Sequence, residues 1–195
     1  MLSILMALAA TQAQPAVTTP PAAPARTLQS VPGVTVKYYD VAGRNGGAIE
    51  KSLKKILATP APNNTAARVF DWSMGLKITK RTEGTVCTIT AADADFTSNA
   101  YLPRLTEEAS VPKDVLANWK PYAEGLEKTA SDNLWFVADR IPALEQSLVG
   151  KPCDQAAPLW KAGVDNLNKQ QNEFAKQAAD SAKAVEDAIA KTKKK

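Results

Sequence analysis

The sequence predicts an α+β domain in which a small antiparallel sheet with one short helix is followed by a long central helix and a long C-terminal helix. Two observations carry this prediction. Residues with high β propensity gather in runs before residue 103, whereas apolar residues recur every three or four positions from residue 114 onward. A chain of 195 residues with 45% apolar content is also long enough for one core of ordinary size.

The first strand is expected at residues 34–41, which are dense in β-branched and aromatic residues. A glycine-rich turn follows at 43–47, and apolar residues at helical spacing then predict a short helix at 49–58. The turn lacks both a Gly-Lys-Ser/Thr ending and the GxGxxG order of phosphate-binding loops. We therefore interpret its glycines as turn residues with positive φ.

Further strands are expected at residues 67–79 and 85–91, joined by a hairpin turn at Thr82-Glu83-Gly84. Another edge segment is expected at residues 94–101. Prolines then close the β-rich half before the helical pattern begins.

The central helix is expected to begin at Asp114, a suitable N-cap residue. Pro121 and Pro142 each predict a kink or a restart within it, and Gly150 predicts its end. Residues 155–190 place apolar side chains on one stripe and predict a long terminal helix.

The N-terminus is typical of an exported protein. At residues 1–13 an apolar run too short to span a bilayer is followed by small residues, which resembles a signal peptide. Residues 14–30, rich in Pro and Ala, predict a linker. We therefore expect an α+β domain at 31–153, a C-terminal helix with a lysine tail at 154–195, a periplasmic or secreted location, and no transmembrane segment.

Cysteine usage agrees with export. Cys87 and Cys153 are the only cysteines, and a lone distant pair in an exported protein predicts one disulfide. A redox or nucleophilic thiol would instead need a neighbour that lowers its pKa, and the chain has neither histidine nor CxxC spacing.

The charge pattern does not indicate nucleic-acid binding. The net charge is +4, and the lysines at 191 and 193–195 supply four positive charges. A nucleic-acid module would interleave basic and aromatic residues along one groove, and no such pattern occurs. The lysine tail is expected to be a solvated end or to make a weak contact with an anionic surface.

The order of several landmarks resembles a known bacterial family. The landmarks are Tyr38-Tyr39-Asp40-Val41 with Gly43, Trp72, Cys87, Leu102-Pro103-Arg104, Trp119 and Cys153. Over residues 34–153 the chain resembles a family of domains of unknown function that are predicted secreted zinc-dependent proteases.

In that family the central helix carries His-Glu-x-x-His, which falls here on Thr129-Ala130-Ser131-Asp132-Asn133. Two histidines four residues apart share a helix face and can hold zinc, while the glutamate acts as general base. Here Thr129 and Asn133 replace the histidines and Ala130 replaces the glutamate. The chain contains no histidine at all, so we expect no catalytic residues, no metal and no cofactor.

Two other kinds of site were considered. Asp132, Glu124 and Glu127 could offer oxygen ligands for a weak calcium or magnesium site, but their pattern also fits the solvated side of an amphipathic helix. The four tryptophans could form a sugar-binding platform. Their positions within strand and helix patterns favour packing, with Trp135 set off the main stripe and able to contact the terminal helix.

The leading hypothesis is an exported, non-catalytic relative of these proteases that acts as an envelope binding or scaffolding protein. Its partner would be an envelope protein or a cell-wall component. One alternative is a peptidase-like hydrolase with an unrecognised site. Another is a helical interaction protein that acts through residues 155–195.

Overall fold

The computed structural model describes residues 26–58 and 68–192, with side chains described up to residue 181. Its strands are β1 (Val34–Val41), β2 (Phe70–Glu83) and β3 (Val86–Leu105). Its helices are α1 (Gly46–Leu57), α2 (Lys113–Ala138), α3 (Ile141–Leu148) and α4 (Ala156–Thr192), with short 3-10 turns η1 (Leu28–Ser30), η3 (Glu108–Ser110) and η4 (Cys153–Gln155). The predicted α+β class, with a short helix before two long ones, is confirmed.

The sheet contains three strands in the order β1-β3-β2 and is mixed, not purely antiparallel as expected. β2 and β3 form an antiparallel hairpin that turns at Gly84, whose φ of 62° is one that glycine adopts readily. β1 instead pairs in parallel with β3, from Val34 opposite Ser98 to Val41 opposite Leu105. Parallel pairing needs a long connection, which the chain supplies through α1 and β2.

β3 is one strand of 20 residues, where the sequence predicted a strand at 85–91 and a separate edge segment at 94–101. The predicted edge is therefore the centre of the sheet. Aspartates inside the run obscured its continuity, because Asp93 and Asp95 have low β propensity but lie on the exposed face. Pro103 is tolerated in β3 because β2 pairing ends at Ala100, so the strand has one neighbour there.

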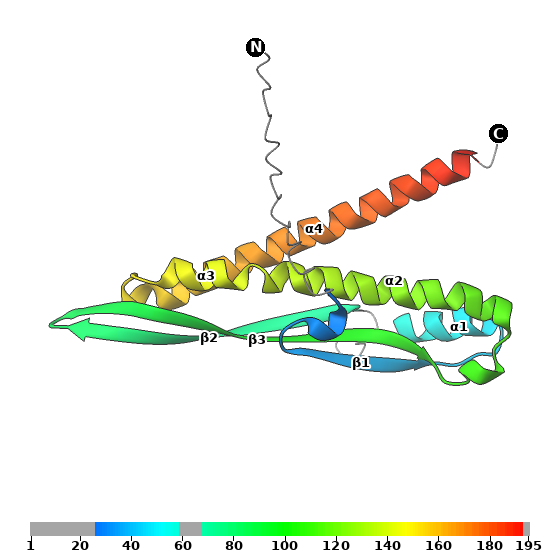
Figure 1. Ribbon diagram of the computed structural model, residues 1–195, viewed down its shortest axis with the longest axis horizontal. Coiled ribbons are helices and arrows are strands. Elements are labelled where there is room, and N and C mark those ends of the chain that lie inside the picture. The colour runs from blue at the N-terminus through cyan, green and yellow to red at the C-terminus, as the bar shows by residue number, and fades with distance from the viewer. Residues whose placement is uncertain (1–25, 59–67, 193–195) are drawn as a thin grey trace, which may run out of the picture.

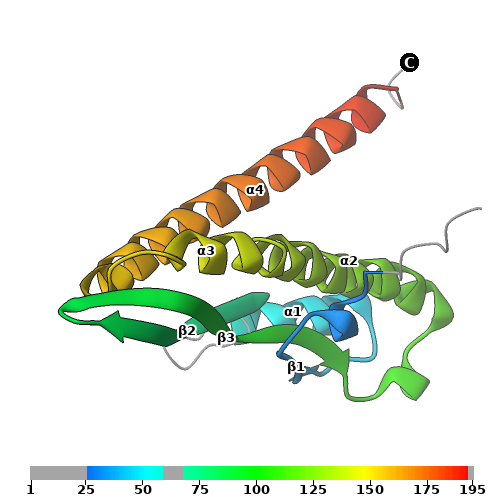
Figure 2. The same ribbon diagram turned by 60° about the vertical axis from the view of Figure 1, so that its left-hand side comes forward.

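Helices lie along one side of the sheet, and α4 rises away from it toward its C-terminal end (Figures 1 and 2). Along β2 and β3, the face of the sheet turned away from the described helices is polar. There Ser73 and Thr97 share a hydrogen bond of 2.7 Å, and Asp71 accepts bonds of 2.8 Å from both Asn99 and Tyr101. The alternation of apolar and polar residues along β2 and β3 explains this division.

Three apolar clusters hold the layers together. The first joins β3 to η1 and the C-terminal half of α2, the second joins β1 to α1 and the start of α2, and the third joins β3 to α3 and α4. Their buried members are Leu28, Val31, Ala100, Leu102, Ala130 and Leu134 in the first, Val41, Ile49, Leu105, Val111 and Trp119 in the second, and Ile89, Leu148 and Ala156 in the third.

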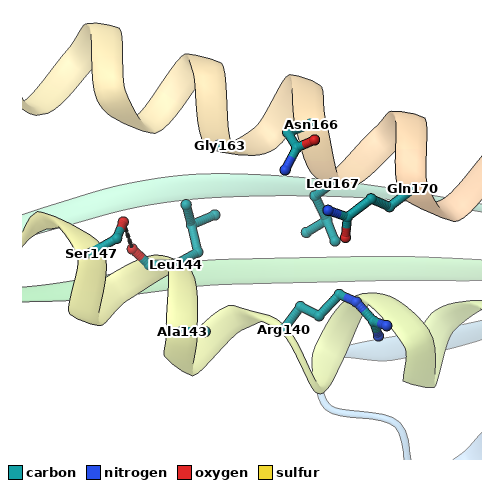
Figure 3. Close-up of a pocket in the computed structure, with 8 residues that line it drawn as sticks. All are labelled: Arg140, Ala143, Leu144, Ser147, Gly163, Asn166, Leu167 and Gln170. Atoms are coloured by element: carbon teal, nitrogen blue, oxygen red, sulfur yellow. Dashed lines mark hydrogen bonds between the residues drawn. The ribbon is translucent and has the colours of Figure 1, made fainter.

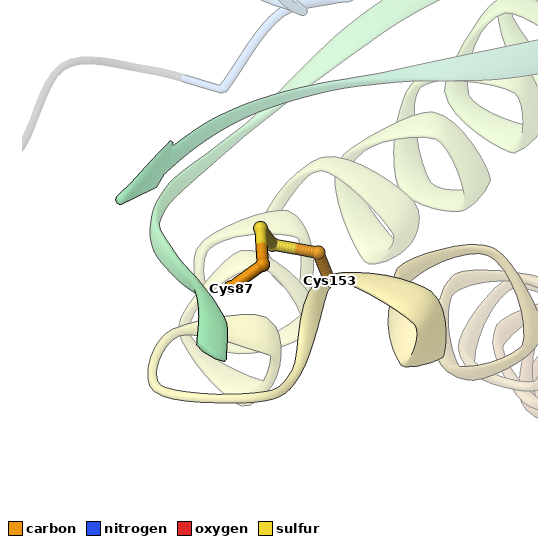
Figure 4. Close-up of a disulfide and its surroundings, with 2 residues drawn as sticks. All are labelled: Cys87 and Cys153. Atoms are coloured by element: carbon orange, nitrogen blue, oxygen red, sulfur yellow. A yellow bond between two sulfur atoms is a disulfide. The ribbon is translucent and has the colours of Figure 1, made fainter. Parts of the chain in front are cut away.

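The loop between α3 and α4 is clamped to the start of β3. Cys87 and Cys153 form the predicted disulfide, which joins this loop to the strand (Figure 4). Beside it, Ile89 donates a backbone hydrogen bond of 2.9 Å to Lys151 and accepts one of 2.9 Å from Gly150. These bonds fix where α4 begins.

Several predicted boundaries are shifted. α2 begins at Lys113, which places Asp114 in the first turn and not at the N-cap, and the helix continues through Pro121. The restart at Pro142 is confirmed by α3. In the glycine-rich turn only Gly43 has positive φ, because Gly46 and Gly47 already belong to α1.

The N-terminal boundary of the fold also differs from the prediction. Leu28 was assigned to the linker at 14–30, yet it is only 1% exposed and sits in the first apolar cluster. The predicted signal peptide at 1–13, the linker up to residue 25, the prolines and asparagines at 60–64, and the lysines at 193–195 lie outside the described residues.

Candidate functional site

Of the motif positions of α2, Ala130, Ser131 and Asn133 are buried, whereas Thr129 and Asp132 are exposed. Ala130 is 0% exposed and packs in the first apolar cluster. Thr129 is exposed, and its hydroxyl donates 2.8 Å to the carbonyl of Gly125. Asn133 is 3% exposed, and its Nδ2 donates 2.8 Å to the carbonyl of Thr129. Both polar motif positions thus use hydrogen bonds within their own helix.

A buried chain of hydrogen bonds links this part of α2 to two other elements. Gln171 of α4 is 6% exposed, and its Nε2 donates 3.2 Å to Oδ1 of Asn133. Its Oε1 accepts a bond of 3.4 Å from the indole N–H of Trp72 on β2. Both ends of the Asn133 carboxamide are therefore occupied, and the chain Trp72–Gln171–Asn133 joins sheet, terminal helix and central helix.

A cavity of about 240 Å³ lies next to this chain. Thr129, Asp132 and Asn133 line it from α2, Phe70 lines it from β2, and α4 closes the remaining side with Phe174, Ala175, Ala178 and Ala179. The motif positions therefore face a space walled by the terminal helix. Its walls are mostly aromatic and methyl groups.

The carboxylates considered as oxygen ligands do not converge. Asp132 accepts a bond of 2.6 Å from Lys128 one turn earlier, and Glu127 accepts one of 3.1 Å from Gln29. Among residues 26–58 and 68–181, no three cysteine or carboxylate side chains gather as a metal would require. The arrangement fits a solvated helix face.

The four tryptophans pack against the apolar clusters, as the sequence pattern predicted. Trp72 and Trp135 adjoin the first cluster, Trp119 belongs to the second, and Trp160 adjoins the third. The indole N–H of Trp135 donates 3.1 Å to the carbonyl of Thr27, so this side chain also fastens the N-terminal segment to α2.

Two tyrosines have shifted acidities. Burial raises the pKa of Tyr39 to about 12, with a smaller contribution from Tyr122. Burial, followed by the hydrogen bond to Asp71, raises the pKa of Tyr101. Both phenols therefore stay protonated at neutral pH, and neither is poised as a base.

Sequence reasoning missed Gln171. It lies four residues after Leu167 and three before Phe174, on the stripe that faces the core. A glutamine on an apolar stripe is a signal for a buried hydrogen-bond partner, but the identity of that partner depends on how α4 packs.

Comparison with known proteins identifies a family for this chain. No curated protein and no solved structure matches the chain. None of the described helices combines the length and apolar character needed to cross a membrane. Residues 36–193 match the family described as "Bacterial protein of unknown function (DUF922)". Because this match spans most of the 195 residues, the chain belongs to that bacterial family.

Proposed function

We propose that this protein is an exported, non-catalytic relative of predicted secreted zinc-dependent proteases and acts as an envelope binding or scaffolding protein. One observation carries the proposal. The Asn133 carboxamide, at a position where the resemblance implies a zinc ligand, is held at both ends by Thr129 and Gln171. This residue has a structural role.

The residues present do not fit a zinc ion. Zinc in proteins takes imidazole, thiolate or carboxylate ligands, whereas the two ligand positions here carry a hydroxyl and a carboxamide. Ala130 has no group to move a proton and is enclosed by apolar side chains. Bound water would therefore have neither an activating metal nor a general base.

The export part of the proposal rests on the Cys87–Cys153 disulfide, because such bonds persist in oxidising compartments such as the periplasm. Thiol alkylation of the protein taken directly from its native cells, followed by mass spectrometry, tests this part. Unmodified cysteines in the intact chain are expected. Full alkylation without prior reduction would contradict export.

The non-catalytic part is tested by hydrolysis of a mixed peptide library with zinc supplied and with chelator added. In both cases we expect the peptides to be cleaved no faster than they are in buffer without the protein. Chelator-sensitive cleavage that the variant Asn133→Ala abolishes, while circular dichroism shows this variant to be folded, would show that α2 does carry a catalytic site.

A second candidate, a helical interaction protein acting through residues 155–195, is favoured by the course of α4. The C-terminal part of α4 extends away from the sheet (Figure 2), and residues 176–181 are exposed, although Ala178 and Ala179 still line the cavity beside α2. A chain ending at residue 181 keeps the contacts of Gln171 and Phe174, so it should fold. Loss of crosslinked envelope partners from this truncated chain supports the second candidate, and unchanged recovery shows that residues 182–195 do not carry the interaction.

A further inference from the structure

A cavity with a volume of about 360 Å³ lies between α3 and α4. Figure 3 shows Arg140 reaching into this space from the α2–α3 junction, and Asn166 and Gln170 reaching toward it from α4. A volume of this size suits a small organic molecule. The cavity is separate from the motif positions of α2, since Thr129 and Asn133 do not line it.

Arg140 is held in a fixed position without an acidic partner. Its Nη1 donates 2.8 Å to the carbonyl of Phe136, and its guanidinium carbon lies 3.4 Å from the centre of the Phe136 ring. That ring stacks on Phe174 of α4 at 4.7 Å. The adjacent Asp139 pairs with Arg26 at 2.6 Å, and in the described part of the chain no carboxylate forms an ion pair with Arg140.

The remaining walls are neutral. The carboxamides of Asn166 and Gln170 can donate further hydrogen bonds, while Ala143, Leu144 and Leu167 give apolar surface. The hydroxyl of Ser147 donates 2.6 Å to the carbonyl of Leu144 and is already engaged. No acidic side chain lines this cavity, and Arg140 supplies its one positive charge. Arg140 also borders a neighbouring cavity that Asp132 and Asp139 line, but neither carboxylate forms an ion pair with it.

We propose that this cavity binds the carboxylate of a small ligand that carries a short apolar group. A planar guanidinium with free N–H groups matches a carboxylate in a bidentate manner, and the carboxamides can donate to the same oxygens. The single positive charge of Arg140 balances the single negative charge of a carboxylate ligand, since the other side chains that line the cavity are neutral. The apolar surface of Leu144 and Leu167 can accept an adjoining methyl or alkyl group.

Nuclear magnetic resonance of the full chain tests this proposal through the Nε–H of Arg140 and the side-chain amides of Asn166 and Gln170. N-acetylalanine stands for the carboxyl end of a peptide, propionate stands for a free acid, and inorganic phosphate is the third probe. We expect saturable shifts at these three groups with a dissociation constant below about 5 mM for at least one carboxylate. Tighter binding of N-acetylalanine indicates a peptide end, and tighter binding of propionate indicates a free acid.

Two variants separate binding from folding. Arg140→Lys keeps the charge but loses the planar fork, and should weaken binding about tenfold. Arg140 also stacks on Phe136, so its replacement could disturb the fold, and a second variant is needed. The double variant Asn166→Leu with Gln170→Leu changes only exposed residues of α4, so the fold should be retained. It removes two hydrogen-bond donors and should weaken binding several-fold. Arg104→Gln, which alters an exposed arginine paired with Asp40, is the matched control and should bind normally.

Shifts that fail to saturate, or phosphate binding tighter than both carboxylates, would overturn the proposal. So would normal carboxylate binding by the double variant. None of these results depends on zinc or peptide hydrolysis, so this site and the non-catalytic role of α2 fail or succeed separately.

Discussion

Replacing Asn133 by alanine should destabilise the fold by about 3 kcal/mol. The change removes two hydrogen bonds, to Thr129 and from Gln171, each with a net value of about 1 kcal/mol. It also leaves the Gln171 amide N–H buried without that partner, at a further cost of about 1 kcal/mol or more. Urea unfolding followed by tryptophan fluorescence measures the free energy of unfolding directly.

Asn118 provides a matched control on the same helix. Its Nδ2 also donates to a carbonyl four residues earlier, that of Asp114 at 3.0 Å, but the side chain is exposed. Asn118→Ala should therefore change stability by less than about 0.5 kcal/mol. A double-mutant cycle of Asn133→Ala with Gln171→Ala should give a coupling energy of about 1 kcal/mol. Equal effects at the two asparagines, or zero coupling, would refute the structural role of Asn133.

Three further predictions concern the core, the disulfide and pH. Ala130→Glu should unfold the chain or lower the free energy of unfolding by more than about 3 kcal/mol, because it places a carboxylate among apolar side chains. Circular dichroism and urea titration check this. A fully stable variant would show that this position opens to solvent. The double variant Cys87→Ser with Cys153→Ser should lose about 4 kcal/mol, the loop-closure value for a sequence separation of 66 residues, and an unchanged urea midpoint would contradict the bond. Stability should fall as pH rises from about 10 to about 12, because folded Tyr39 keeps a proton that the unfolded chain releases; Tyr39→Phe should reduce this slope, and a slope identical to wild type would be the contrary result.

Local features of this fold follow from local patterns in the sequence. β-Branched and aromatic residues predicted β1, helical spacing predicted α1 and α4, and Pro142 marked the start of α3. Propensity and periodicity act over a few residues, so they locate elements better than they pair them. The Cys87–Cys153 bond was predictable because the chain offers one combination of cysteines.

Contacts between residues far apart in the sequence were harder to predict. Parallel pairing of β1 with β3 depends on how the chain returns after α1, and no residue of Val34–Val41 encodes that direction. The contact between Asn133 and Gln171 joins residues 38 apart through the packing of α4 on α2. Sequence comparison with the zinc motif drew attention to Asn133, but its role as a buried hydrogen-bonding residue became visible only in the assembled fold.

Elemental mass spectrometry of the full chain is the most direct test of the central claim that the motif positions of α2 are structural. The protein should be purified without chelators and also dialysed against zinc before analysis. The account predicts far less than one zinc per chain in both samples. One tightly bound zinc per chain, lost in Asn133→Ala but retained in Asn118→Ala, would contradict it and assign a metal to α2.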